Sequence, residues 1–302
     1  MDIIFATNDN FCQHAAVAIA SLLDNNKNEK IYIHLFAIEC SSENIEKIKI
    51  VAEEFKVKIT VYIITSEIFK DFPPTGNYSI ACYLRLLSPS LLPNIDKVLY
   101  LDCDLVVNGS IKKLWDIDIT DYSMAALHDA TLSYNIVKDY INYNYYEEGY
   151  INSGVLLINL KYWREHNIQE KLVEFLNTNI VKLPDQDALN IILHGTIKFF
   201  HPKWNTHVGY FAYPPLVIKE QKKYIKELWD DAVIIHFTGP AKPWYNECVN
   251  PYKKVYLKYL RQTPYKDYIL QRLENKKINS IKIIILRTIK NIIAKFISFT
   301  YK

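Results

Sequence analysis

The sequence predicts an α/β fold with a mixed, mainly parallel sheet flanked by helices. Short apolar runs rich in Ile, Val and aromatic residues alternate with longer segments in which apolar residues recur every three or four positions. Strands separated by single helices are typical of βαβ units, which build parallel sheets. Several apolar runs also lead directly into polar clusters, which is where open α/β sheets bind their ligands. We therefore expect one main α/β domain at residues 1–248.

The predicted elements follow from local patterns. Runs rich in Ile and aromatic residues predict strands, whereas Ser41-Ser42-Glu43 resembles a helix cap and precedes apolar residues at helical spacing. The predicted strands are 2–7, 31–38, 57–64, 97–101, 123–127, 155–160 and 233–237. The predicted helices are one that ends near 24, one that carries 45, 48, 52 and 55 on one face, and those at 79–87, 161–177 and 185–193.

Composition narrows the setting of the protein. Five Cys residues without a CxxC pair indicate reduced thiols, and neither a disulfide framework nor a zinc ribbon. The N-terminus lacks the basic region of a signal peptide. No apolar run approaches the roughly 18 residues that a membrane span needs. We therefore expect a cytoplasmic protein.

Charge is distributed unevenly along the chain. Residues 276–302 carry seven basic residues and no acid, whereas the preceding residues carry 29 basic and 33 acidic ones. A mildly acidic body excludes a uniformly basic nucleic-acid-binding protein, so we expect no nucleic-acid partner.

The basic segment is also amphipathic. Ile281, Ile285, Ile289 and Phe296 recur among its bases at helical spacing. We expect residues 249–302 to form a helical region whose tail, 276–302, lies on an anionic membrane surface, peripherally at the inner face of the plasma membrane. The alternative is a helix packed on the body with a solvated basic face.

Asp102 and Asp104 directly follow the apolar run KVLYL. In an extended backbone their side chains project to the same side, and neighbouring carboxylates repel each other unless a cation lies between them. The pair therefore indicates a hard-metal site, with a solvated acidic loop as the alternative. His236 also follows an apolar run, and an imidazole beside two carboxylates favours Mn²⁺ over Mg²⁺. Gly239 and Lys242 suit a phosphate, through close backbone approach and a positive charge.

Other positions are ambiguous on their own. Asp185, Gln186 and Asp187 follow Pro184 at a predicted helix start, where acids complement the helix dipole. That explanation does not account for Gln186. Arg85 is either a surface helix residue or a cation directed at the site, and Asn152 is expected just before the strand.

Seven segments together resemble glycosyltransferase family 8, the retaining galactosyl- and glucosyltransferases of GT-A (Rossmann-like) fold that use nucleotide sugars. They are FATNDN at 5–10, YLRL at 83–86, VLYLDCDLVV at 98–107, LHDA at 127–130, YINSGVLLINLKYWR at 150–164, LPDQDALN at 183–190 and HFTGPAKPW at 236–244. They occur in the order of the family. The chain looks most similar to bacterial lipo-oligosaccharide and lipopolysaccharide galactosyl- or glucosyltransferases.

The resemblance implies a UDP-galactose or UDP-glucose donor and Mn²⁺, with Mg²⁺ as the alternative, held by Asp102, Asp104 and His236. It implies phosphate contacts for Gly239 and Lys242. It implies uridine contacts for Thr7, Asn8 and Asn10, and donor binding in the DxD segment for Cys103. The residues expected to contact the hexose are Arg85, Asn152, Asp129, Asp185 and Gln186. The residues with an expected catalytic role beside the hexose are Gln186, Asp185, Asp187 and Asp129. Asn8 departs from the close bacterial relatives, which usually carry Asp there.

The resemblance also raises the question of mechanism. Gln186 is expected below the sugar, and an amide oxygen is a poor nucleophile. We therefore expect attack on the same face as departing UDP, and no covalent intermediate on Gln186 or Asp187. The expected acceptor is a saccharide, such as a lipid-linked glycan of lipopolysaccharide or lipo-oligosaccharide type. Aromatic residues at 134–150 and 204–213 are expected to wall its pocket, unless they are core.

Asp102 to Val106 also matches the DxDx[TV] string of haloacid dehalogenase-type, Mg²⁺-dependent phosphatases. There Asp102 would be the nucleophile and Asp104 the acid/base. That string normally follows the first strand, whereas three predicted strands precede it here. The transferase is therefore favoured over the phosphatase. A membrane-bound binding module with an inactive site is a third possibility, and it predicts no turnover even with Mn²⁺.

Overall fold

The computed structural model describes residues 1–73, 79–129, 149–212, 217–239, 242–248 and 250–272. The expected tail at 276–302 and nearly all of the aromatic segment at 134–150 lie outside these residues. Within the described ranges, no helix has the length and apolar character needed to cross a membrane.

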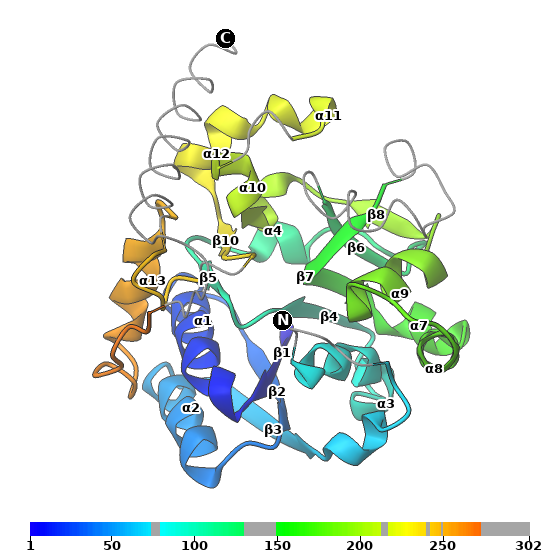
Figure 1. Cartoon of the computed structure of the whole chain (residues 1–302), viewed down its shortest axis with the longest axis horizontal. Coiled ribbons are helices and arrows are strands. Elements are labelled where there is room, and N and C mark those ends of the chain that lie inside the picture. The colour runs from blue at the N-terminus through cyan, green and yellow to red at the C-terminus, as the bar shows by residue number, and fades with distance from the viewer. Residues whose placement is uncertain (74–78, 130–148, 213–216, 240–241, 249, 273–302) are drawn as a thin grey trace.

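The main sheet has seven strands in the order β3-β2-β1-β4-β7-β6-β8 (Figure 1). The strands are β1 Asp2–Asn8, β2 Tyr32–Ile38, β3 Lys58–Ile64, β4 Lys97–Leu101, β6 Met124–His128, β7 Ile151–Asn159 and β8 Ile197–Phe199. β7 runs antiparallel to both of its neighbours, and the other pairs are parallel. This arrangement confirms the predicted mixed, mainly parallel α/β fold.

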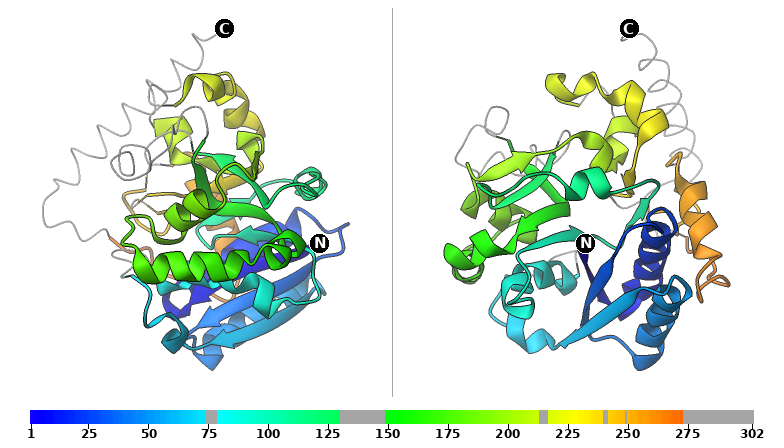
Figure 2. Two further views of the ribbon diagram at one scale, coloured as in Figure 1. Left: turned by 90° about the vertical axis from the view of Figure 1, so that its right-hand side faces the viewer. Right: turned by 180° about the vertical axis from the view of Figure 1, so that it is seen from behind.

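Alternating side chains divide the core between the two faces of the sheet. Ile3 and Phe5 of β1 point to one face, whereas Ile4 and Ala6 point to the other. The first face packs against α1 Cys12–Asp24, α2 Ser42–Glu54 and α13 Lys253–Leu260. The second packs against the 3-10 helix Ile80–Leu87, α3 Ser88–Leu91, α7 Leu160–Glu165, α8 Ile168–Thr178 and α9 Pro184–Ile192. Figure 2 shows both layers from the side and from behind.

A second, three-stranded sheet lies beside the first. Its order is β5-β10-β9, with β5 Leu105–Val107, β10 Ile234–His236 and β9 Thr206–His207. The late strand expected at 233–237 is therefore β10, and it belongs to this small sheet. The remaining described helices are α4 Lys112–Trp115, α10 Val208–Ala212, α11 Lys219–Lys222, α12 Ile225–Asp231 and the short 3-10 helices Asp9–Phe11, Ser66–Phe69 and Pro202–Trp204.

Three predicted elements differ from the structure. The helix expected at 79–87 is a 3-10 helix from Ile80 to Leu87. The helix expected at 161–177 is two helices, because Asn167 adopts a left-handed conformation with φ of 50°. Asn152 lies inside β7 and not before it, since β7 pairs with β6 back to Ile151 beyond a β-bulge, with Asn152 opposite Leu127. The Asn190 side chain bonds both backbone polar groups of Ile151.

The chain beyond residue 248 contributes to the core. α13 packs beside α1 (Figure 1), and its Tyr256 and Tyr259 are buried. Trp204, Tyr210 and Phe211 are buried in the same core. These three aromatic residues are therefore part of the core, as the alternative interpretation of 204–213 expected.

His14 joins α1 to the C-terminal part of the chain. Its ring stacks on Trp244 at a centroid distance of 3.5 Å, and its Nδ1 lies 2.7 Å from the Tyr256 hydroxyl. Burial lowers the pKa of His14 to about 3. The ring is therefore neutral in the folded protein near neutral pH.

Because the pKa of His14 is higher in the unfolded chain, the unfolded chain gains a proton first as the pH falls below about 6.5. Through His14, the free energy of unfolding therefore falls progressively as the pH drops from about 6.5 to about 3. In urea unfolding, the free energy of unfolding of wild type should fall by about 2 kcal/mol relative to that of His14→Phe between pH 7.5 and pH 5. Tyr256→Phe, which removes the hydrogen bond without a titrating group, should cost the same at both pH values. An unchanged wild-type-to-His14→Phe difference would contradict a neutral buried ring.

Candidate active site

The candidate site lies where β4 of the main sheet and β10 of the small sheet end. Asp102 directly follows β4, and its amide donates to the Gly154 carbonyl of β7 at 2.9 Å. His236 is the last residue of β10, which pairs with β5 immediately after Asp104. The junction of the two sheets therefore brings two segments far apart in sequence together.

Asp102 is held by two neighbours through one oxygen. Its Oδ1 accepts hydrogen bonds from the Arg85 guanidinium at 2.9 Å and from the Tyr100 hydroxyl at 2.7 Å. Arg85 also lies over the Tyr100 ring, 4.1 Å from its centroid. The second oxygen, Oδ2, faces His236 Nε2 at 3.7 Å. One oxygen thus orients the carboxylate while the other faces the site.

Asp104 is the more buried of the two carboxylates. Its Oδ1 lies 3.0 Å from His236 Nε2, and its Oδ2 pairs with the Lys242 ammonium. Burial alone would disfavour the charged carboxylate, but Lys242 and His236 outweigh burial and hold the pKa of Asp104 well below its ordinary value. Lys242 also donates to the Phe237 carbonyl at 2.8 Å. Asp104 is therefore ionised.

Arg85 connects this carboxylate pair to α9. Its guanidinium is 3.2 Å from Asp185 Oδ2, donates to the Ser153 carbonyl, and is almost fully buried. Burial opposes its charge, yet Asp102 and Asp185 raise the pKa of Arg85 above its ordinary value. Burial raises the pKa of Asp185, although Arg85 opposes that effect. The sequence left Arg85 ambiguous, and the structure places it in the site.

Gly154 makes the close approach of Asp102 and His236 feasible. A Cβ atom at residue 154 would lie 2.1 Å from His236 Cε1 and 2.9 Å from Asp102 Oδ2. Any side chain would displace one of these two groups. The Gly in the INSGV segment is therefore required by packing within the site.

The Asp102, Asp104 and His236 side chains fit a divalent cation. Each offers one ligand atom, and the three atoms lie within 4.8 Å of one another. Two carboxylate oxygens and one imidazole nitrogen form a donor set that suits Mn²⁺. These residues are the three that the sequence predicted as metal ligands.

The residues around Gln186 form a second group. Gln186 Oε1 accepts from the Ser153 amide at 3.0 Å and from Asn152 Nδ2 at 3.4 Å. Asp187 is fully buried, and its carboxylate accepts from the Tyr150 hydroxyl and from two backbone amides at the start of α9. Gln186 thus joins Asn152, whereas Asp187 is engaged with Tyr150 and α9.

The residues expected at the nucleotide lie at the end of β1. Thr7 is fully buried, and Asn10 is exposed. The Asn8 amide donates to Ser79 Oγ at 2.8 Å and accepts from the Phe11 amide at 3.2 Å. The Cys103 thiol points into the core and donates to the Ala6 carbonyl, so its backbone is what the site can use. The uridine contacts remain predictions.

Two further expected residues flank the metal group. Gly239 adopts φ of +83°, a left-handed conformation that favours Gly. Asp129 is buried with one oxygen 3.7 Å from His207 Nε2. Burial lowers the pKa of His207 to about 4, although Asp129 opposes that effect.

Sequence reasoning missed Tyr100, Asn205 and His207. Tyr100 precedes Asp102 by two positions, so strand alternation could have found it. Asn205 directly precedes β9 and His207 ends it, and β9 is two residues long and has no recognisable pattern of its own.

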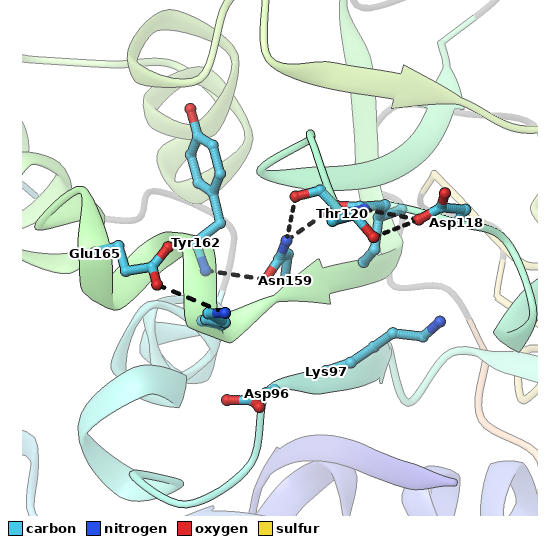
Figure 3. A pocket seen from close by; sticks show the side chains of 9 residues that line it. Asp96, Lys97, Asp118, Thr120, Asn159, Tyr162 and Glu165 are labelled. Atoms are coloured by element: carbon cyan, nitrogen blue, oxygen red, sulfur yellow. Dashed lines mark hydrogen bonds and ion pairs between the residues drawn. The ribbon is translucent and has the colours of Figure 1, made fainter.

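A cavity of about 380 Å³ lies at the end of β4 and β7 that is opposite to Asp102, where β4 begins and β7 ends (Figure 3). Asp118 accepts from Thr120, and Asn159 donates to backbone carbonyls at residues 119, 120 and 122. None of the predicted site residues lines it. We therefore place the candidate site at the Asp102–His236 junction.

Comparison with known proteins gives the family of this fold and site. The family model described as Glycosyl transferase family 8 matches residues 2–248. General stress protein A of Bacillus subtilis is 31% identical over 274 residues, which are 87% of this chain and 94% of that protein. A lipopolysaccharide 1,2-glucosyltransferase of Escherichia coli is 31% identical over 250 residues, which are 81% of this chain and 73% of that protein.

Solved structures agree. The crystal structure of galactosyltransferase LgtC in complex with donor and acceptor sugar analogs has a TM-score of 0.75 and 28% sequence identity. The similarity covers 87% of this chain and 96% of LgtC. The model match, the relatives and the shared fold together show that this chain belongs to glycosyltransferase family 8.

Proposed function

We propose that this glycosyltransferase moves galactose or glucose from UDP to a saccharide acceptor with retention of configuration and with Mn²⁺ dependence. The observation that carries the proposal is the convergence of Asp102, Asp104 and His236 within 4.8 Å at the junction of the two sheets. A relative named lipopolysaccharide 1,3-galactosyltransferase, from Salmonella typhimurium, is 29% identical over 87% of this chain and 79% of its own length. That similarity supports an envelope glycan as the acceptor, with the enzyme at the inner face of the plasma membrane.

The charged residues suit departure of UDP. A divalent cation held by Asp102, Asp104 and His236 supplies charge stabilisation for a diphosphate leaving group. The Lys242 ammonium pairs with the Asp104 carboxylate, so it lies beside the proposed metal ligands and could also contact the diphosphate. The left-handed Gly239 exposes backbone close by, which suits a phosphate contact. Arg85 holds Asp102 and Asp185 in place from the buried side.

The contacts of Gln186 and Asp187 support same-face attack. A nucleophile needs a free lone pair directed at the anomeric carbon. Gln186 Oε1 is held by the Ser153 amide and Asn152, and the Asp187 carboxylate is directed at the Tyr150 hydroxyl and at the backbone amides of residues 182 and 183. We infer that Gln186 and Asn152 orient the hexose, and that a UDP oxygen removes the proton of the acceptor. Asp129, which lies beside His207, is also proposed to contact the transferred hexose.

The phosphatase alternative is not favoured. The DxD segment follows β4, the central strand of the main sheet, and its second Asp is paired with Lys242 and His236. The family match also covers residues 2–248 as a glycosyltransferase.

We expect Asp104→Asn to lower turnover of UDP-galactose or UDP-glucose by about 100-fold or more, because loss of one charged ligand removes several kcal/mol of leaving-group stabilisation. UDP release in the presence of Mn²⁺ measures this effect. EDTA should abolish wild-type turnover. Asp116→Asn, an exposed carboxylate paired with Lys112, is the matched control and should leave turnover unchanged. Hydrolysis of an aryl phosphate at a comparable rate would instead favour the phosphatase.

Enzyme quenched with acid during turnover should have the mass of the unmodified chain, because the amide oxygen of Gln186 is a poor nucleophile and the Asp187 carboxylate is directed at Tyr150 and the start of α9. Intact-mass spectrometry with each UDP-hexose tests this expectation. A hexosyl adduct mapped to either residue would overturn same-face attack.

Removal of residues 276–302 should abolish binding to anionic vesicles, because each base contributes on the order of 1 kcal/mol at such a surface. Co-sedimentation measures binding, and neutral vesicles are the control. UDP-hexose hydrolysis should persist in the shortened chain. Vesicle binding that survives the deletion would refute the role of the tail.

A further inference from the structure

Asn205 is a buried amide that contacts the proposed metal ligand His236. It is fully buried and directly precedes β9, which pairs with β10 so that His207 lies opposite His236. The Asn205 Oδ1 atom lies 2.9 Å from His236 Nδ1. Asn205 Nδ2 lies 2.8 Å from Asn152 Oδ1. The pairing of β9 with β10 therefore places Asn205 between a metal ligand and a proposed sugar-binding residue.

The orientation of the Asn152 amide follows from backbone groups. The Gly154 amide donates to Asn152 Oδ1 at 3.1 Å, and a backbone amide is always a donor. The Ser153 amide likewise fixes Gln186 Oε1 as an acceptor, and Asn152 Nδ2 donates to that oxygen. Both contacts require the oxygen of Asn152 to face Asn205.

The protonation of His236 follows from the same chain of contacts. Because Asn152 presents oxygen, Asn205 must direct its NH₂ group toward Asn152 and its carbonyl oxygen toward His236. A carbonyl oxygen accepts and does not donate, so Nδ1 of His236 carries a proton. The nitrogen opposite, Nε2, is the one that faces Asp104 at 3.0 Å and Asp102 at 3.7 Å.

We propose that Asn205 is a positioning residue that fixes His236 in the Nδ1–H tautomer and so presents the Nε2 lone pair to the cation. The inference rests on the metal site of the proposed function. Histidine ligands generally donate their other ring N–H to a fixed acceptor, which sets both the tautomer and the ring orientation. Here the acceptor is an amide that is itself fixed by the backbone of β7. The metal ligand and the sugar-contacting residues Asn152 and Gln186 are thereby joined in one hydrogen-bonded unit.

Two substitutions separate this role from simple packing. Asn205→Leu removes the acceptor, and Mn²⁺ affinity should fall about 10- to 100-fold. Asn205→Asp keeps an oxygen toward Nδ1–H and loses only the donor toward Asn152, so its Mn²⁺ affinity should fall clearly less than that of Asn205→Leu. Asn26→Leu removes an equally buried amide that bonds Leu22, Gly109 and Ile111 away from the site, and it should leave Mn²⁺ affinity unchanged.

Mn²⁺ affinity is measured on the metal-free full-length chain from the electron paramagnetic resonance signal of free Mn²⁺, with folding checked by circular dichroism. Equal affinity of Asn205→Leu and wild type overturns the role of Asn205, as does equal weakening in Asn205→Leu and Asn205→Asp. Wild type that binds no Mn²⁺ instead overturns the metal site of the proposed function, and with it this inference.

A measurement on the unmodified sequence tests the tautomer even if Asn205→Leu does not fold. Ring ¹⁵N spectra of the histidine-labelled protein should show a proton on Nδ1 of His236. The signal is assigned by its loss in His236→Gln. An Nδ1 without a proton overturns the inference.

Discussion

The buried charge of Arg85 is the interaction on which the site depends. A guanidinium removed from water is tolerated only where it is paired and hydrogen-bonded, and Arg85 meets this condition with Asp102, Asp185 and two backbone carbonyls. Those partners come from the end of β4, the start of α9, the 3-10 helix and β7. One cation thus fixes four elements at the edge where the sheet presents its ligands. Removal of either carboxylate would leave the buried guanidinium with a single acidic partner, so the geometry around Arg85 is strongly constrained.

The second constraint is the meeting of two sheets. β4 delivers Asp102 and Asp104, and β10 of the small sheet delivers His236, with Gly154 of β7 in the narrow space between them. The polar chain through Asn152 and Asn205 then joins β7 to β9. Buried polar groups of this kind are stable when every member is satisfied. The same hydrogen bonds that stabilise the junction therefore also orient the groups that are proposed to bind the metal and the sugar.

Much of this could be predicted from the sequence. The strands from β1 to β4 and the Ser41 cap of α2 were found because their patterns are local: Ser41 Oγ accepts from the Asn44 amide, as the cap signal predicted. Predictions were wrong where tertiary contacts decided the outcome. Asn167 interrupts the helix expected at 161–177, and pairing with β6 beyond a β-bulge extends β7 back to Ile151, so that it includes Asn152. The short strands β5 and β9 were missed, since two or three residues carry too little periodicity to be recognised.

The sequence by itself determined the fold class and identified Asp102, Asp104 and His236 as candidate metal ligands, because alternating apolar runs and the polar residues that follow them are local features that neighbouring residues specify. The tertiary structure decided how those residues are used. It turned Arg85 inward, engaged Asp187 at the start of α9, directed the Cys103 thiol into the core and placed Asn205 against His236. The physical reason is that hydrogen-bond partners of buried polar groups come from segments distant in sequence. Their identity depends on how two sheets pack, and no single segment encodes that packing.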